Sequence, residues 1–268
     1  MTAPPPQTPV EPRPAATVLL VRDEPGSGDL QVFLQRRVAG MAFAGGMTVF
    51  PGGGVARDDT PDPDRWTGPD PERFGARLGL DAEPAAAVVT AAVRETFEES
   101  GVLLAATDGD APGPVGHLAD DRAQLVDHRV SLPWLLAEHD LQLRADLLVP
   151  WSRWITPQGQ PKRYDTAFLV ARVPEGQDAD DHTSEAVEAR WWRPADALAA
   201  YETGDVKLMP PTLRTLQELA EHNDTAAVLD AAESRDISPI TPEVRREGKV
   251  VTITLPGDPT WRFTEAGR

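Results

Sequence analysis

Three glutamates, Glu95, Glu98 and Glu99, are spaced at i, i+3 and i+4 in a stretch that ends at Gly101. At about 100° per residue, this spacing places their carboxylates on one face of a helix. Like charges so close together repel each other, and a hard divalent cation such as Mg²⁺ or Mn²⁺ would offset that repulsion. The pattern therefore indicates a metal site or, alternatively, a solvated acidic face on which Arg94 pairs with Glu98.

The residues around these glutamates predict the helix that would carry them. It is entered through Ala85 and stopped by Gly101, a residue type that favours the left-handed conformation at helix ends. Val89, Val93 and Phe97 recur at steps of four, on the side opposite the glutamates. We expect that apolar side to pack against the rest of the protein.

The run from Arg94 to Val102 has the pattern Arg-Glu-x-x-Glu-Glu-x-Gly followed by an apolar residue. This pattern resembles the second half of the sequence box that defines the Nudix hydrolases. In that family the first half lies directly upstream, as a glycine followed six residues later by a glutamate. Here Phe50-Pro51-Gly52-Gly53 supplies the glycines, and an insertion at about 57–84 separates them from the helix.

The glutamate that usually braces the arginine of the box is missing from its normal place. That position, eight residues before Arg94, is Ala86. Asp59 lies six residues after Gly53 and could substitute, but we do not assign it this role. The insertion could shape or cover the site at its rim, or it could be inert surface.

Further stretches resemble one branch of the family, the peroxisomal coenzyme A diphosphatases of human Nudix type 19, which also split their box with a long insertion. The resemblance runs from about Ala15 to Asp258 and includes Trp154–Pro157, Arg163–Leu169 and Leu208–Pro211. It implies an α/β (α+β) fold, the Nudix α/β/α sandwich with a mixed β-sheet. It also implies hydrolysis of a diphosphate linkage, with coenzyme A or acyl-CoA as the favoured substrate.

The resemblance assigns roles to individual residues of this chain. Arg94 and Gly101 would be structural, and Mg²⁺ or Mn²⁺ would be held by Glu95, Glu98 and Glu99. The same three glutamates would be catalytic, together with Glu185, a further candidate base six residues before Trp191. The residues expected to bind substrate are Arg36, Arg37, Gly52, Gly53 and Arg163. Ala42 departs from the coenzyme A hydrolases, which often carry an arginine at that position.

Composition limits the classes of partner. The chain has 268 residues, a formal net charge of −17 and no cysteine. This charge argues against binding to nucleic-acid polymers, and the sequence contains no apolar run long enough for a membrane helix. The absence of cysteine excludes disulfides and fits a reducing cytoplasm. We expect a small nucleotide diphosphate as substrate, a cytoplasmic location and, from the family, a homodimer.

The order of segments suggests one main domain with extensions. We expect a disordered proline-rich tail at 1–14, a Nudix hydrolase domain at 15–223, and an extension at 224–268 packed on that domain. Apolar runs predict strands at about 15–22, 30–37, 147–156, 166–173 and 250–255. Helical patterns lie at about 73–80, 120–138, 194–200 and 210–221, which together favour a mixed sheet between helices.

Other functions on the same scaffold remain open. The substrate could be ADP-ribose, NADH or a nucleotide sugar rather than coenzyme A. The chain could also be a nucleotide-sensing module without activity, or an isomerase. Sensing modules usually lose carboxylates from the box, whereas this chain retains all three glutamates, so the sequence favours a hydrolase.

Overall fold

The computed structural model describes residues 10–40, 44–180, 186–248 and 250–266. Its centre is a mixed seven-stranded sheet with five strands in the order β10-β2-β1-β9-β8, to which β3 and β4 add by pairing with β2 and β1. These strands are β1 (Arg13–Asp23), β2 (Leu30–Arg37), β3 (Thr48–Val49), β4 (Gly52–Gly54), β8 (Val149–Ile155), β9 (Tyr164–Arg172) and β10 (Ala186–Trp192). β1 and β9 run parallel, and the other pairs are antiparallel.

The apolar run of β1 serves both faces of this sheet. Val18 and Leu20 belong to one hydrophobic core, and Leu19 and Val21 belong to the other. Successive side chains of a strand point to opposite faces, so a central strand covered on both sides needs a continuous apolar sequence. The two cores make the sheet the middle layer of a sandwich.

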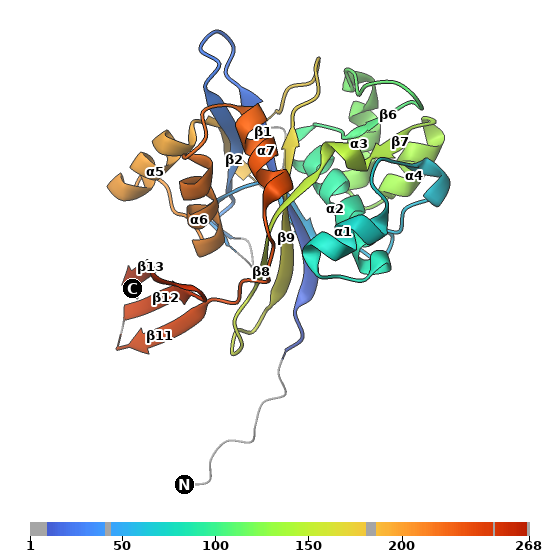
Figure 1. Ribbon diagram of the computed structural model, residues 1–268. Coiled ribbons are helices and arrows are strands. Elements are labelled where there is room, and N and C mark those ends of the chain that lie inside the picture. Colours follow the sequence, from blue (N-terminus) through green and yellow to red (C-terminus); the bar gives the residue numbers. More distant parts are fainter. Residues whose placement is uncertain (1–9, 41–43, 181–185, 249, 267–268) are drawn as a thin grey trace.

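Helices form the outer layers (Figure 1). One core contains residues of α1 (Pro71–Leu78), α2 (Ala82–Ser100), α3 (Ala119–Val126) and α4 (Leu132–Glu138). The other contains residues of α5 (Pro194–Thr203), α6 (Pro210–Leu219) and α7 (Thr225–Ser234). The expected α/β/α sandwich with a mixed sheet is therefore confirmed. No helix among the described residues is long and apolar enough to cross a membrane.

Two small sheets flank the sandwich. One has the strand order β5-β7-β6, with β5 at Trp66–Thr67, β6 at Ala105–Ala106 and β7 at Gln142–Arg144. The other is made of β11 (Glu243–Glu247), β12 (Val250–Leu255) and β13 (Asp258–Ala266), which Figure 1 shows below α6. Short 3-10 turns lie at Pro63–Arg65, Gly116–Leu118 and Ala145–Leu147.

The helix predicted from the glutamate spacing is α2. It begins three residues before the predicted start, at Ala82, and the predicted apolar side is buried, with Val89, Val93 and Phe97 at most 1% exposed. Gly101 caps the helix in the left-handed conformation, with φ of 74°, and its N–H donates to the Phe97 carbonyl oxygen. Both the element and its end are confirmed.

The segment 57–84 is partly core rather than inert surface. It contains α1, whose Phe74 and Leu78 side chains are 3% and 0% exposed and belong to the same core as α2. Arg153 on β8 holds the end of α1 by donating to the carbonyl oxygens of Leu78 and Gly79, at 2.8 Å each. An insertion that buries this much apolar surface contributes to stability.

Both ends of the chain contain differences from the expected elements. β1 begins at Arg13 rather than Ala15, because the Arg13 N–H donates to the Arg163 carbonyl oxygen. Of the rest of the predicted tail, residues 10–12 precede β1 outside any helix or strand, and residues 1–9 lie outside the described residues. α7 was not predicted, since only Thr225, Val228 and Ala232 are buried along it and the apolar pattern is weak. β11 and β13, the partners of the predicted strand at 250–255, were also missed.

The end of α2 gives a test of the fold. A β-carbon added at Gly101 would lie 2.7 Å from Asp180 Oδ2 and 2.8 Å from Arg122 Nη1. We expect Gly101→Ala to lower the free energy of unfolding by more than the about 1–2 kcal/mol that left-handed backbone alone costs. Gly204→Ala is the control, because Gly204 also caps a helix at positive φ but has open space around it. Equal losses in urea unfolding would contradict tight packing at Gly101.

Candidate active site

The last turns of α2 lie under the glycine strand β4, and Glu99 joins the two. One carboxylate oxygen, Oε2, accepts hydrogen bonds from the Gly52 N–H at 2.7 Å and from Gln35 Nε2 at 2.5 Å. The other oxygen, Oε1, lies 3.6 Å from Arg37 Nη1. Glu99 is 3% exposed, so these contacts fix a buried carboxylate at the junction of helix and sheet.

Backbone approaches Gly52 too closely for any larger residue, and the Glu95 carboxylate approaches Gly53. A β-carbon on Gly53 would lie 2.3 Å from Glu95 Oε1, and one on Gly52 would lie 2.3 Å from the Ala16 carbonyl oxygen. Gly52 also has φ of 154°, at the edge of the region that favours glycine. The glycines therefore let β4 approach both β1 and the glutamates of α2 closely.

Arg94 occupies the centre of the acidic cluster. Its guanidinium binds both oxygens of Asp59, through Nε at 2.8 Å and Nη2 at 3.0 Å. Nη1 donates to Glu95 Oε1 at 2.8 Å and reaches Glu98 Oε2 at 3.2 Å. Nη2 also donates to the Gly54 carbonyl oxygen at 2.9 Å, so one buried side chain ties α2 to β4 and to the insertion.

Asp59 therefore braces the arginine, a role that the sequence analysis left unassigned. Asp59 is 1% exposed, and its Oδ2 also accepts from the Ala56 N–H at 2.7 Å. The fork of a guanidinium matches a carboxylate in this two-bond arrangement, which is stronger than a single ion pair. Ala86, at the usual position, is an apolar core residue on α2.

The glutamates are not a solvated acidic face, because Glu98 is 8% exposed and Glu99 3%. Burial raises the pKa of Glu98 to about 7, the charge of Glu95 adds to the rise, and Arg94 opposes it. Burial alone would lower the pKa of Arg94, but its hydrogen bond to Asp59 and the nearby carboxylates raise it above the usual value. The cluster thus holds negative charge that one guanidinium compensates only in part.

The donor set suits a hard cation, although the side chains do not form a finished metal site. Among the described residues, no group of three or more Asp, Glu, His or Cys side chains comes together in ligating positions. Glu95 and Glu98 point to Arg94, and Glu99 points to Gly52 and Gln35. Carboxylate oxygens on one helical face are nevertheless ligands that Mg²⁺ and Mn²⁺ prefer.

The expected substrate-binding arginines occupy three different environments. Arg37 shares a face of β2 with Gln35 and lies at Glu99. Arg36 points to the opposite face and contacts Glu188 Oε2 at 3.3 Å. Arg163 is buried and holds backbone, with Nε on the Thr156 carbonyl oxygen and Nη1 on that of Val10.

Other expected residues also have defined positions. Gly52 and Gly53 lie against the glutamates, as described above, and Glu185 lies outside the described residues. Gln35 was missed by the sequence analysis. The signal was its position in β2. Gln35 shares a face with Phe33, which packs in the core beside α2, and at such a position strand alternation predicts an apolar side chain.

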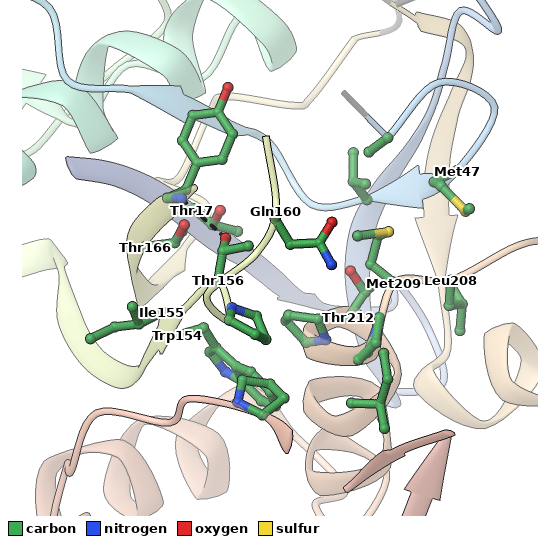
Figure 2. Close-up of a pocket in the computed structure, with 18 of the residues that line it drawn as sticks. Thr17, Met47, Trp154, Ile155, Thr156, Gln160, Thr166, Leu208, Met209 and Thr212 are labelled. Atoms are coloured by element: carbon green, nitrogen blue, oxygen red, sulfur yellow. Dashed lines mark hydrogen bonds between the residues drawn. The ribbon is translucent and has the colours of Figure 1, made fainter. Parts of the chain in front are cut away.

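A cavity of about 620 Å³ lies on the face of the central sheet that packs against α6, whereas α2 packs against the opposite face. Thr17 of β1 lines it, and Thr17 pairs with Gly52 in the sheet. Figure 2 shows residues of the β8–β9 hairpin, such as Thr156 and Gln160, facing Met209 across it. The helix site and the cavity are therefore close to each other, linked by the Thr17–Gly52 residue pair of the sheet.

Comparison with known proteins identifies the family. A family model described as the NUDT19 Nudix domain matches residues 80–219. The chain belongs to this family of Nudix domains. It is 33% identical to the acyl-coenzyme A diphosphatase NUDT19 of Homo sapiens, over 48% of this chain and 38% of the human protein. It is 28% identical to the Gallus gallus protein of the same name, over 77% of this chain and 68% of that protein.

The match to the human relative, like that to the Xenopus laevis one, spans 38% of the relative's length. Among solved structures, a NUDIX hydrolase from Alicyclobacillus acidocaldarius is 25% identical and aligns with a TM-score of 0.68. That alignment covers 82% of this chain and 96% of the other. It supports the Nudix fold over most of the described residues.

The Arg94–Asp59 pair predicts a large effect on stability. Asp59→Ala would leave a buried guanidinium without its main partner, and removing one member of a buried pair costs about 3–5 kcal/mol. We expect a loss of this size in the free energy of unfolding measured with urea. Asp58→Ala is the matched control, since Asp58 is exposed and adjacent in the chain. A loss at Asp59 no larger than at Asp58 would show that the pair contributes little.

The raised pKa of Glu98 predicts that the stability of the metal-free protein depends on pH. Because its folded pKa of about 7 exceeds the unfolded value of 4.5, the stability from its protonated form is complete below pH 4.5 and lost as pH rises through 7. Glu98→Gln stays neutral throughout. With EDTA present, we expect Tm of this variant to exceed that of the wild type at pH 8, with the gain shrinking toward pH 5. A difference that does not change with pH would contradict the raised pKa.

Proposed function

We propose that this protein is a Nudix diphosphatase that depends on a divalent metal and hydrolyses a nucleoside diphosphate linked to another group. The observation that carries the proposal is the buried cluster of Glu95, Glu98 and Glu99 beneath the glycine strand β4. Water attacks one phosphorus, the bridging P–O bond breaks, and two monophosphates form. Family membership makes this reaction class the first to test.

The three glutamates are our proposed metal ligands, with Mg²⁺ or Mn²⁺ as the ion. A bound cation would neutralise phosphate charge and lower the pKa of bound water. Glu99 brings a buried carboxylate to this group, held in place where its Oε2 accepts from Gly52 and Gln35. The structural role proposed for Arg94 is to hold Glu95 and Glu98 on the same side of the helix, which its contacts of 2.8 and 3.2 Å support.

The proton of the attacking water goes to a carboxylate. One of the three glutamates would take it as general base. Glu185 stays a candidate base from the sequence analysis. The closeness of Arg37 to Glu99 favours it over Arg36 for contact with a substrate phosphate.

Coenzyme A or acyl-CoA is the substrate we propose, with 3′,5′-ADP and (acyl-)4′-phosphopantetheine as products. The support is the name of the relatives from frog, human and chicken, acyl-coenzyme A diphosphatase. The arginine missing at Ala42 weakens the parallel to other coenzyme A hydrolases. ADP-ribose, NADH and nucleotide sugars are the alternatives, and a sensing module without activity is the alternative outside enzymes.

The remaining proposals concern context. The chain contains no cysteine, which fits a reducing compartment such as the cytoplasm. The net charge of −17 argues against nucleic-acid polymers as partners. We also propose a homodimer, as the family suggests.

Isosteric substitution tests the metal helix. Glu99→Gln keeps an oxygen for the Gly52 N–H but removes the charge, so we expect turnover to fall by about 10²–10³, the scale of losing one stabilising group in an active site. Thermal unfolding should change little. Glu83→Gln, an exposed glutamate in the first turn of the same helix, is the control. Full activity in the Glu99 variant would rule out the assignment.

A substrate panel tests the proposed specificity. With Mg²⁺ present, coenzyme A should give 3′,5′-ADP and 4′-phosphopantetheine, identified by mass. Cleavage of ADP-ribose or NADH without cleavage of coenzyme A would overturn the substrate assignment and keep the reaction class. Metal-dependent binding without any phosphate product would favour the sensing module.

A further inference from the structure

The cavity beside β4 has three walls that come from separate parts of the chain. The β8–β9 hairpin contributes Trp154 and Pro157, and the start of α6 contributes Met209. The third wall is the C-terminal sheet β11–β13, with Val244, Ile253 and Phe263 among its contributions. This sheet lies beyond the residues that the Nudix family model matches, which end at 219.

The chemistry of the walls favours an apolar ligand. Lys162 carries the one charged side chain among the described residues that line the cavity. The Trp154 indole N–H is already bonded to Ser152 Oγ, and Thr156 Oγ1 accepts from the Tyr164 N–H. A nucleobase needs several convergent polar groups, and a nucleotide phosphate needs more than one cation. A hydrocarbon chain needs neither, and the volume of about 620 Å³ lies within the range of ligand pockets.

The cavity also lies close to the candidate active site, on the other face of the sheet. Thr17, in its wall, pairs with Gly52, and the Gly52 N–H donates to Glu99. One residue pair of the sheet thus links the apolar cavity to the buried acidic site. A ligand with a diphosphate at one part and a hydrocarbon at another matches this division.

We propose that the cavity binds the acyl chain of a fatty acyl thioester substrate, and that the C-terminal sheet sets how long a chain it accepts. This inference rests on the proposed function for the position of the diphosphate. Each buried methylene contributes at most about a fourfold gain in affinity, from about 0.8 kcal/mol per CH₂. KM should therefore fall with chain length until the cavity is full. The KM for unacylated coenzyme A should not change when the C-terminal sheet is altered.

Kinetics with saturated acyl-CoA from acetyl to dodecanoyl test the proposal on the full-length protein. Ile253→Glu places a charge in the apolar wall. Thr252→Glu is the matched control, since it is the neighbouring residue on β12 and points to the opposite face. Val244→Trp fills the cavity instead of charging it, and thermal unfolding reports whether each variant is folded.

We expect the wild type and Thr252→Glu to show KM falling by at least tenfold along the series. Ile253→Glu should lose this dependence and keep the wild-type rate on coenzyme A, and Val244→Trp should move the optimum to shorter chains. No dependence in the wild type, or an unchanged dependence in both cavity variants, would overturn the proposal. If Ile253→Glu fails to fold, Val244→Trp alone decides.

A binding measurement separates this inference from the proposed function. If coenzyme A is not cleaved at all, the proposed function fails, and the cavity is then tested with the fluorescent fatty acid cis-parinarate in EDTA. Wild-type binding that Val244→Trp or Ile253→Glu weakens at least tenfold would support an apolar-chain site. Absence of binding to the wild type would overturn it.

Discussion

The buried guanidinium of Arg94 is the interaction on which the candidate site depends. It binds Asp59 with two hydrogen bonds, contacts Glu95 and Glu98, and donates to the backbone of Gly54. Through these contacts, α2, β4 and the insertion are held in one arrangement. Burying an ion is costly unless its hydrogen bonds are satisfied, and here each of its three nitrogens has a partner.

The arrangement leaves an excess of negative charge on α2. The carboxylates of Asp59, Glu95, Glu98 and Glu99 face only two guanidinium groups, those of Arg94 and Arg37. Burial and the charge of Glu95 raise the pKa of Glu98 to about 7. A protein selected for stability alone would gain by replacing one of these glutamates. The excess is explained if the site binds a cation, since binding to the folded state then restores stability by mass action. Under the proposed function, stability without metal and activity with metal are therefore opposed in this cluster.

The sequence predicts the features that depend on neighbouring residues and misses the contacts between residues far apart in the chain. The spacing of the glutamates and of Val89, Val93 and Phe97 predicted α2 and its buried side, because helical period is a local property. Strand period would also have separated Arg36 from Arg37, since neighbours on a strand point to opposite faces.

Contacts that depend on the path of the chain could not be predicted in this way. Asp59 binds Arg94 from the start of the insertion, and the path of the insertion in space cannot be predicted from residue spacing. Gln35 meets Glu99 only because β2 lies beside the end of α2. β11, in the C-terminal sheet, is short and mostly exposed, so its apolar pattern was too weak to predict it. β13 does carry a strand signal, since buried Trp261 and Phe263 alternate with exposed residues, and this signal was missed.

We propose that this acidic cluster binds a divalent cation in order to act on a diphosphate. Calorimetric titration of the purified protein with Mn²⁺ tests it most directly, with and without a nucleotide diphosphate present. We expect saturable binding to the wild type, lost when Glu98 and Glu99 are both changed to glutamine. Absence of cation binding under both conditions, or equal binding by that double variant, would contradict it.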